Sequence, residues 1–326
     1  MTYYKRAYEK EVENWARQSG DLQRIRVHET WFHSDTADFW RHWRMYGAVD
    51  PLAGKSDATW LTVGDGRYGL DSIRLRQKGI NAVPSDIAEQ YLRKAKQDGL
   101  IDQYYVENVE SLTFGDDSFD YVFCKETFHH LPRPMIALYE MVRVAREAVV
   151  LIEPNDDELP LPGRVVSLII SFSISLPRGL VSRAIRVLHG VWPKKNHVHT
   201  TSTGDLQEVG HCIVGPYEPG GNYVYSLSKK EVVKAALGLN LPAIAHKGLN
   251  DYYIKGCEFE KATFKSSKYQ RIRVSIFRAD MLSKLRLRNQ DLLMIIIFKK
   301  PICKDTIERL RSGRWNIIQL PRNPYP

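Results

Sequence analysis

Three glycines and one aspartate have the types and spacing of a nucleoside-binding site. Gly64, Gly66 and Gly69 directly follow Trp60–Val63, an apolar, β-branched run that is typical of a short buried strand. Glycines at a strand-to-helix turn permit positive φ and let a ligand approach the backbone closely. Asp86 ends a second predicted strand about 20 residues beyond the turn, where a carboxylate can accept hydrogen bonds from ribose hydroxyls. The sequence therefore predicts a βαβ unit that binds a nucleoside.

The glycine pattern alone leaves the nucleoside open. Gly64-x-Gly66-x-x-Gly69 matches the dinucleotide fingerprint, and such a match taken alone is a weak signal. A glycine-rich turn without any ligand is the plainer alternative. The choice depends on the rest of the chain.

Length and composition are those of a globular protein. The chain has 326 residues, 43% hydrophobic and 26% charged, which allows one large core or two smaller ones. Residues 2–18 are charged throughout and lack the apolar stretch of a signal peptide. Four cysteines lie far apart, a pattern that argues against zinc and against a disulfide framework. We therefore predict a reducing, cytoplasmic location and no metal site.

Positive charge is concentrated towards the C-terminus. The net charge is +9, and residues 261–326 contain 16 Lys and Arg against 4 Asp and Glu. Such a surface can meet phosphate groups, nucleic acid or an anionic membrane, or it can simply be solvated.

Hydrophobic periodicity divides the chain into five regions of different character. They are a helical cap (1–50), a core of alternating strands and helices (51–154), a lid or substrate insertion (155–227), the end of the core sheet with a basic helical insertion at 258–289 (228–300), and a basic tail (301–326). Strands that alternate with helices are typical of a doubly wound parallel sheet. We predict an α/β fold with a mostly parallel, seven-stranded, Rossmann-like sheet, an N-terminal helical cap and helical insertions.

Five segments follow one another in a recognisable order. They are the glycine turn GDGRYG, Asp86, Glu107–Phe114, Asp117–Val122 and His129–Pro134. In this order and spacing they resemble the motifs of class I S-adenosylmethionine-dependent methyltransferases of the small-molecule branch. The resemblance runs from Trp60 to Pro154 and resumes at Ser228 and Leu292. It implies S-adenosylmethionine as the cofactor, because a dehydrogenase has no particular need for residues 108–134.

The resemblance also implies a set of cofactor-binding residues. They are Gly64, Asp65, Gly66, Gly69, Asp86, Ile87, Asn108, Val109 and Lys125. Asn108 stands where the family commonly has an acid beside the adenine amine. Thr62 stands where the family usually has an acid that helps to hold the methionine amino group, and the third glycine falls one place late. These departures keep a non-catalytic, cofactor-binding scaffold open as an alternative.

Methyl transfer requires a nucleophile held in line with the methyl group, and a hydroxyl nucleophile also requires a general base. His129 and His130, after the fourth predicted strand, and His197, on the predicted lid, are the catalytic candidates. The alternative for the first two is a structural role in their turn. We predict transfer to a small or medium molecule, O-directed, of an acidic, phosphorylated or saccharide-linked class. An RNA methyltransferase is the rival enzyme, motivated by the basic C-terminal region.

Residues 165–176 are apolar except for their serines and are flanked by arginines. Twelve residues are too few to cross a bilayer as a helix, which needs about 20. A lid helix over the active site and an interfacial helix that contacts a membrane surface are the two interpretations. The sequence carries no signal for an oligomeric state.

Overall fold

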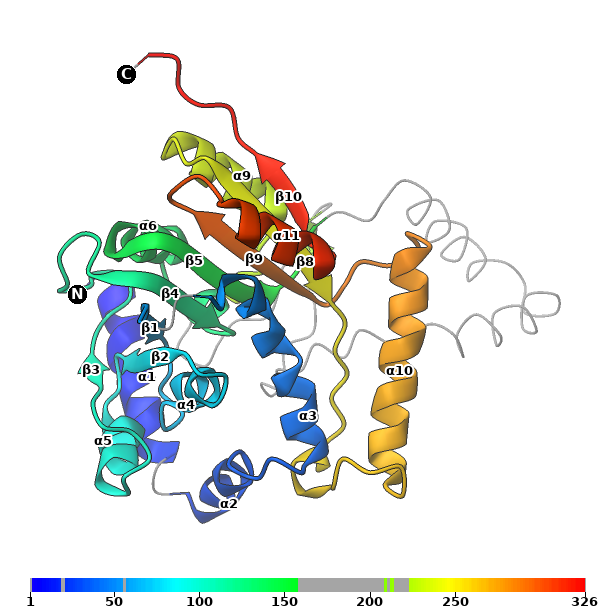
Figure 1. Cartoon of the computed structure of the whole chain (residues 1–326). Coiled ribbons are helices and arrows are strands. Elements are labelled where there is room, and N and C mark those ends of the chain that lie inside the picture. Colours follow the sequence, from blue (N-terminus) through cyan, green and yellow to red (C-terminus); the bar gives the residue numbers. More distant parts are fainter. Residues whose placement is uncertain are drawn as a thin grey trace.

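The computed structural model describes residues 2–18, 21–54, 57–157, 208–209, 212–213 and 223–325. Its centre is an eight-stranded sheet in the order β10-β8-β9-β5-β4-β1-β2-β3 (Figure 1). The strands are β1 (Thr59–Val63), β2 (Asn81–Asp86), β3 (Tyr105–Val106), β4 (Phe119–Lys125), β5 (Ala145–Pro154), β8 (Ala243–Leu249), β9 (Leu292–Phe298) and β10 (Asn316–Gln319). A separate two-stranded sheet joins β6 (Glu208–Val209) to β7 (Cys212–Ile213).

Strands β1 to β5 pair in parallel, whereas β9 is antiparallel to both β5 and β8. The predicted α/β fold with a mostly parallel sheet is confirmed. The predicted number of seven strands is wrong, because β10 pairs with β8 as an antiparallel eighth strand. The segment 301–326, predicted as a tail, contains β10 and helix α11 (Lys304–Ser312). Leu310 and Trp315 anchor this segment because both side chains are buried in the core.

Helices cover both faces of the sheet. They are α1 (Tyr3–Gln18), α2 (Leu22–Thr30), α3 (Ala37–Trp43), α4 (Leu70–Gln77), α5 (Gln90–Gln97), α6 (Pro134–Val144), α9 (Lys229–Gly238), α10 (Ser267–Lys284) and α11, with short 3₁₀ turns η1 (Met45–Ala48), η2 (Asp50–Leu52), η3 (Phe128–His130) and η4 (Cys257–Phe259). Met141 of α6 and Val232 of α9 pack on one face. Leu75 of α4 and Leu310 of α11 pack on the other. The sheet is therefore doubly wound.

Local sequence explains several of these boundaries. The central parts of β4 and β5, Tyr121–Cys124 and Ala148–Ile152, are continuous apolar runs, as expected of strands that are buried on both faces. Helix α9 begins at a capping box, in which Ser228 and Glu231 satisfy each other's backbone amides. The basic amphipathic helix predicted within 258–289 corresponds to α10, whose cap is Ser266.

Helices α3 and α10 lie side by side at the edge of the molecule (Figure 1). Ala37 and Trp40 of α3 pack against Tyr269 and Ile272 of α10. Arg41, 4% exposed, pairs with Asp38 at 2.6 Å and also with Asp251. A buried arginine needs such partners, because an unpaired buried charge is strongly destabilising. The network fixes α3 against the chain that leads from β8 towards α10.

Three predictions fall outside the described residues. They concern most of the lid (155–227), the membrane-contact segment (165–176) and His197. Among the helices that the structure describes, none combines the length and apolar character required to cross a membrane.

Candidate active site

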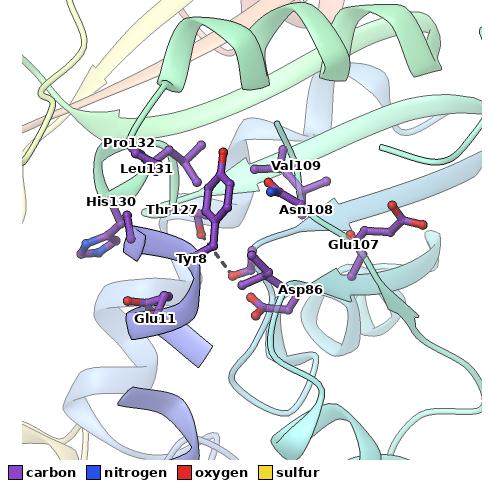
Figure 2. A pocket seen from close by; sticks show the side chains of 15 residues that line it. Tyr8, Glu11, Asp86, Glu107, Asn108, Val109, Thr127, His130, Leu131 and Pro132 are labelled. Atoms are coloured by element: carbon purple, nitrogen blue, oxygen red, sulfur yellow. Dashed lines mark hydrogen bonds between the residues drawn. The ribbon is translucent and has the colours of Figure 1, made fainter. Parts of the chain in front are cut away.

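A cleft of about 490 Å³, including the part open to solvent, lies at the carboxyl ends of β1, β2 and β4. Ligands bind at this edge in open α/β sheets. Figure 2 shows side chains of α1 on one side of the cleft and side chains that follow β2 and β3 on the other. The lining consists of Ala7, Tyr8, Glu11, Val63, Gly64, Ser85, Asp86, Ile87, Glu107, Asn108, Val109, Thr127, His130, Leu131 and Pro132.

At two positions in the predicted turn, neighbouring side chains lie too close for any residue larger than glycine. Gly64 has φ of +68°, and a Cβ added there would lie 2.0 Å from Cγ2 of Thr127. A Cβ on Gly66 would lie 2.7 Å from Oδ2 of Asp86. Gly69, with φ of +67°, directly precedes α4 and lets the chain turn into that helix. The turn therefore brings the backbone of β1 close to the acid at the end of β2.

Asp86 is the acid that the cleft presents at the place predicted for a ribose. Its side chain is 6% exposed, and Oδ1 accepts a hydrogen bond from the amide of Ala88 at 2.8 Å. Burial raises the pKa of Asp86 to about 7, and the nearby charge of Glu11 acts in the same direction. The amides of Ala88 and Gly66 oppose this shift. Each carboxylate oxygen has two lone pairs, so capacity remains for ligand hydroxyls.

Asp65, the second predicted acid, has its carboxylate outside the cleft lining. Its oxygens accept hydrogen bonds from the amides of Asp71 at 2.9 Å and Ser72 at 2.8 Å. Thr62 donates its hydroxyl hydrogen to Oδ2 of Asp65 at 2.8 Å. Burial, followed by repulsion from Asp71, raises the pKa of Asp65 well above its usual range. Asp65 thus satisfies the first amides of α4, and Thr62 supports it there.

Lys125, also predicted to bind the cofactor, contacts other parts of the protein. Its Nζ lies 3.0 Å from Oε2 of Glu126 and 3.6 Å from Oδ1 of Asp71. Burial disfavours the charged amine, but Asp71 and Glu126 outweigh burial and raise the pKa of Lys125. By contrast, the predicted residues Ile87, Asn108 and Val109 all line the cleft. The amide oxygen of Asn108 accepts a hydrogen bond from the backbone of Glu110 at 3.0 Å.

The structure separates the two neighbouring histidines. His129 is 0% exposed, and its Nδ1 lies 2.6 Å from Oε2 of Glu153, which is also fully buried. The other oxygen of Glu153 accepts hydrogen bonds from the amides of Thr127 and Phe128, at 3.0 and 2.9 Å. The Glu153 carboxylate therefore fixes the turn after β4, and burial prevents His129 from contacting a substrate. His130 lines the cleft and remains the accessible candidate base.

Sequence reasoning did not assign the wall that α1 contributes. The hydroxyl of Tyr8 donates to Oε2 of Glu110 at 2.5 Å and accepts a hydrogen bond from Arg133 at 3.0 Å. Arg133 also donates to Glu110 at 2.6 Å, and its guanidinium lies 3.9 Å from the centre of the Tyr4 ring. These contacts hold α1 beside the cleft, where Tyr8 and Glu11 line the side opposite Asp86 (Figure 2). The spacing of Tyr8 within a helical pattern predicts only that its ring faces inward. This spacing does not tell whether the ring packs in the core or forms part of the wall of a cleft.

Comparison with known proteins assigns the centre of this fold. The family model described as "Methyltransferase domain" matches residues 61–152. This segment is a class I methyltransferase domain. It contains the glycine turn, Asp86, Asn108 and the turn after β4. Every residue that lines the cleft therefore belongs to the methyltransferase domain, except those that α1 contributes.

The methyltransferase domain also has curated and structural relatives. The 2-methyl-6-phytyl-1,4-hydroquinone methyltransferase of Synechocystis sp. is 26% identical over 138 residues, which are 40% of this chain and 43% of that protein. The chain thus matches less than half the length of this relative. A putative methyltransferase of Haloferax volcanii, solved with the Trm112 activator, is 15% identical with a TM-score of 0.44, covering 81% of this chain and 92% of that one. A possible histamine N-methyltransferase of Thermotoga maritima is 12% identical with a TM-score of 0.44, covering 92% of this chain and 100% of that one.

Proposed function

We propose that this protein transfers the methyl group of S-adenosylmethionine to a small or medium-sized acceptor. The observation that carries the proposal is the carboxylate of Asp86, which lies against Gly66 in a cleft of a methyltransferase domain. Gly66 lets the backbone of the turn lie close to this carboxylate, because a Cβ there would come within 2.7 Å of Oδ2. An adenosine group whose ribose hydroxyls donate to Asp86 fits this arrangement.

The charge of the lining supports a cationic ligand. Glu11, Asp86 and Glu107 border the cleft, and the described lining contains no Lys or Arg. Carboxylates stabilise a nearby positive charge, and S-adenosylmethionine carries a sulfonium and an ammonium group. When bound, this cofactor supplies an electrophilic methyl group. The protein's task is to hold an acceptor atom in line with that methyl group and to exclude water.

The raised pKa of Asp86 predicts pH-dependent cofactor binding. Ribose hydroxyls donate hydrogen bonds, so the ionised carboxylate is the binding form, and protonation below about pH 7 removes it. The dissociation constant of S-adenosylhomocysteine should therefore increase by about tenfold for each pH unit below 7 and level off above it. Calorimetric titration across this range measures the effect.

The matched control for this titration is Asp86→Asn, which has the same shape but no ionisation in this range. Its affinity should be lower and nearly independent of pH. A wild-type affinity that stays flat through pH 7 would show that Asp86 is not the titrating contact.

For the acceptor, we propose an uncharged molecule with a reactive hydroxyl. A phosphorylated or otherwise acidic acceptor would find no cationic partner among the described lining residues. The Synechocystis relative is named for a hydroquinone, which carries ring hydroxyls. His130 borders the cleft beside Leu131 and Pro132, in a position to accept the proton of such a hydroxyl.

Substitution of His130 by glutamine is expected to lower the rate of methyl transfer about a hundredfold, because the side chain can no longer accept the proton. Binding of S-adenosylhomocysteine should change little. The assay uses labelled S-adenosylmethionine with a panel of hydroquinones and other phenols. An unchanged transfer rate in His130→Gln would exclude this residue as the base.

The same assay separates the enzyme from a cofactor-binding scaffold. A dissociation constant of about 1 mM corresponds to very weak binding. If S-adenosylhomocysteine did not bind even at about this concentration, the proposal would be contradicted. Binding that depends on Asp86 without transfer to any acceptor in the panel would favour the scaffold.

A further inference from the structure

Helix α10 has apolar side chains on two opposite faces. Tyr269, Ile272, Ile276, Ala279 and Leu282 are buried, and they form the inner face of the helix. On the outer face, Val274, Phe277, Met281 and Leu285 are 47%, 64%, 42% and 61% exposed. Their spacing of three and four residues places them in one line along the helix. We call these four residues the outer stripe.

Basic side chains flank the outer stripe on both sides. At 100° per residue, Arg273 and Lys284 lie along one edge, and Arg271 and Arg278 lie along the other. Within the part of the chain that the structure describes, none of the four forms an ion pair with a carboxylate. The guanidinium of Arg273 lies 4.7 Å from the centre of the Phe264 ring. The acid of α10, Asp280, lies towards the protein and accepts a hydrogen bond from Asn250 at 2.7 Å. The outer face of α10 is therefore apolar along its centre and positive along its edges.

We propose that the outer stripe of α10 docks on an anionic phospholipid surface. A helix with this distribution lies in the plane of the interface, with its apolar side chains at the boundary between headgroups and acyl chains. Arginine and lysine at the edges extend their charged ends to lipid phosphates. Such binding is peripheral and does not require a membrane-spanning helix.

Charge complementarity favours a lipid surface over other occupants of this face. A second copy of the chain would bring two sets of basic flanks together, which is repulsive. A nucleic acid would match the arginines but would leave Val274, Met281 and Leu285 without an apolar partner. An anionic bilayer satisfies both the charges and the apolar stripe.

The attachment of α10 makes the proposal testable. Its inner face packs against Trp40 and the rest of the α3 contact, so outer substitutions leave those contacts in place. Figure 1 shows α10 at the periphery, beside α3 and apart from the central sheet. None of the residues that line the cleft belongs to the outer stripe, so its test is independent of the proposed methyl transfer.

The test is co-sedimentation of the full-length protein with vesicles of phosphatidylcholine alone or with one-third phosphatidylserine. The wild type should bind the anionic vesicles, and added salt should weaken that binding. The double variant Phe277→Glu/Leu285→Glu should bind at least about tenfold more weakly. The variant Arg271→Gln/Arg278→Gln should lose most of the preference for phosphatidylserine.

The matched control is Leu237→Glu/Leu239→Glu at the end of α9, where the two leucines are 40% and 39% exposed. This variant should bind like the wild type, and thermal melting of each variant verifies its fold. The proposal is overturned if the wild type and Phe277→Glu/Leu285→Glu bind vesicles equally. It is also overturned if the wild type does not bind anionic vesicles. A wild-type dimer that the stripe variant converts to a monomer would assign the face to a second copy, and RNA binding that needs only the arginines would assign it to nucleic acid.

Discussion

Replacing Asp86 by alanine is expected to weaken the binding of S-adenosylhomocysteine about a thousandfold. The carboxylate would accept hydrogen bonds from both ribose hydroxyls, and each such bond to a charged group contributes about 1.5–3 kcal/mol. Isothermal titration calorimetry at pH 8, where Asp86 is ionised, measures the difference directly.

The alanine variant should remain folded. The pKa of Asp86 is raised because burial disfavours its charged form. Removing the carboxylate therefore removes an unfavourable buried charge from the folded protein at neutral pH. The matched control is Asp102→Ala, because Asp102 is 91% exposed in a surface ion pair with Arg76. An affinity within about twofold of the wild type, less than one hydrogen bond contributes, would remove Asp86 from the cofactor site.

Replacing Glu153 by alanine is expected to lower the free energy of unfolding by about 3–5 kcal/mol. The carboxylate is fully buried and contacts the ring of His129 and the amides of Thr127 and Phe128. Without it, these groups lose a partner in a region closed to water, and each unsatisfied donor costs about 1–3 kcal/mol. Urea denaturation followed by circular dichroism measures the change.

Strand β5 supplies the control for this substitution. Glu147 lies on the same strand and pairs with Lys300 at 3.0 Å, where Lys300 is 52% exposed. Surface pairs of this kind contribute about 0–1 kcal/mol, so Glu147→Ala should change stability little. If both substitutions had the same small effect, Glu153 would not be the group that holds the turn after β4.

The sequence predicts best those features that depend on neighbouring residues. The glycine turn, Asp86 and the strands on either side follow from local composition and spacing, and the structure has β1 and β2 paired in parallel there. Asn108 and Val109 were placed by the family resemblance, and both line the cleft. The alternating pattern of strands and helices was sufficient for the fold class.

Features that depend on which group a side chain or a strand pairs with were not predictable in this way. Asp65 has the position of a ligand-binding acid, but its carboxylate satisfies amides six and seven residues later in α4. β10 is a four-residue strand whose pairing with β8 depends on a contact far along the chain. The role of Tyr8 depends on Glu110, 102 residues away. Periodicity and propensity describe a segment's own shape and leave such partners undetermined.

The wall formed by α1 shows that the recognisable unit and the enclosing unit of this protein have different boundaries. The family segment spans residues 61–152, whereas Ala7, Tyr8 and Glu11 close one side of the cleft. A chain shortened to the family segment would keep the glycine turn and Asp86 but would open that side to water. Transplanting this segment into another protein would therefore transfer the proposed cofactor contacts without the enclosure, and the recipient would have to supply a helix of its own.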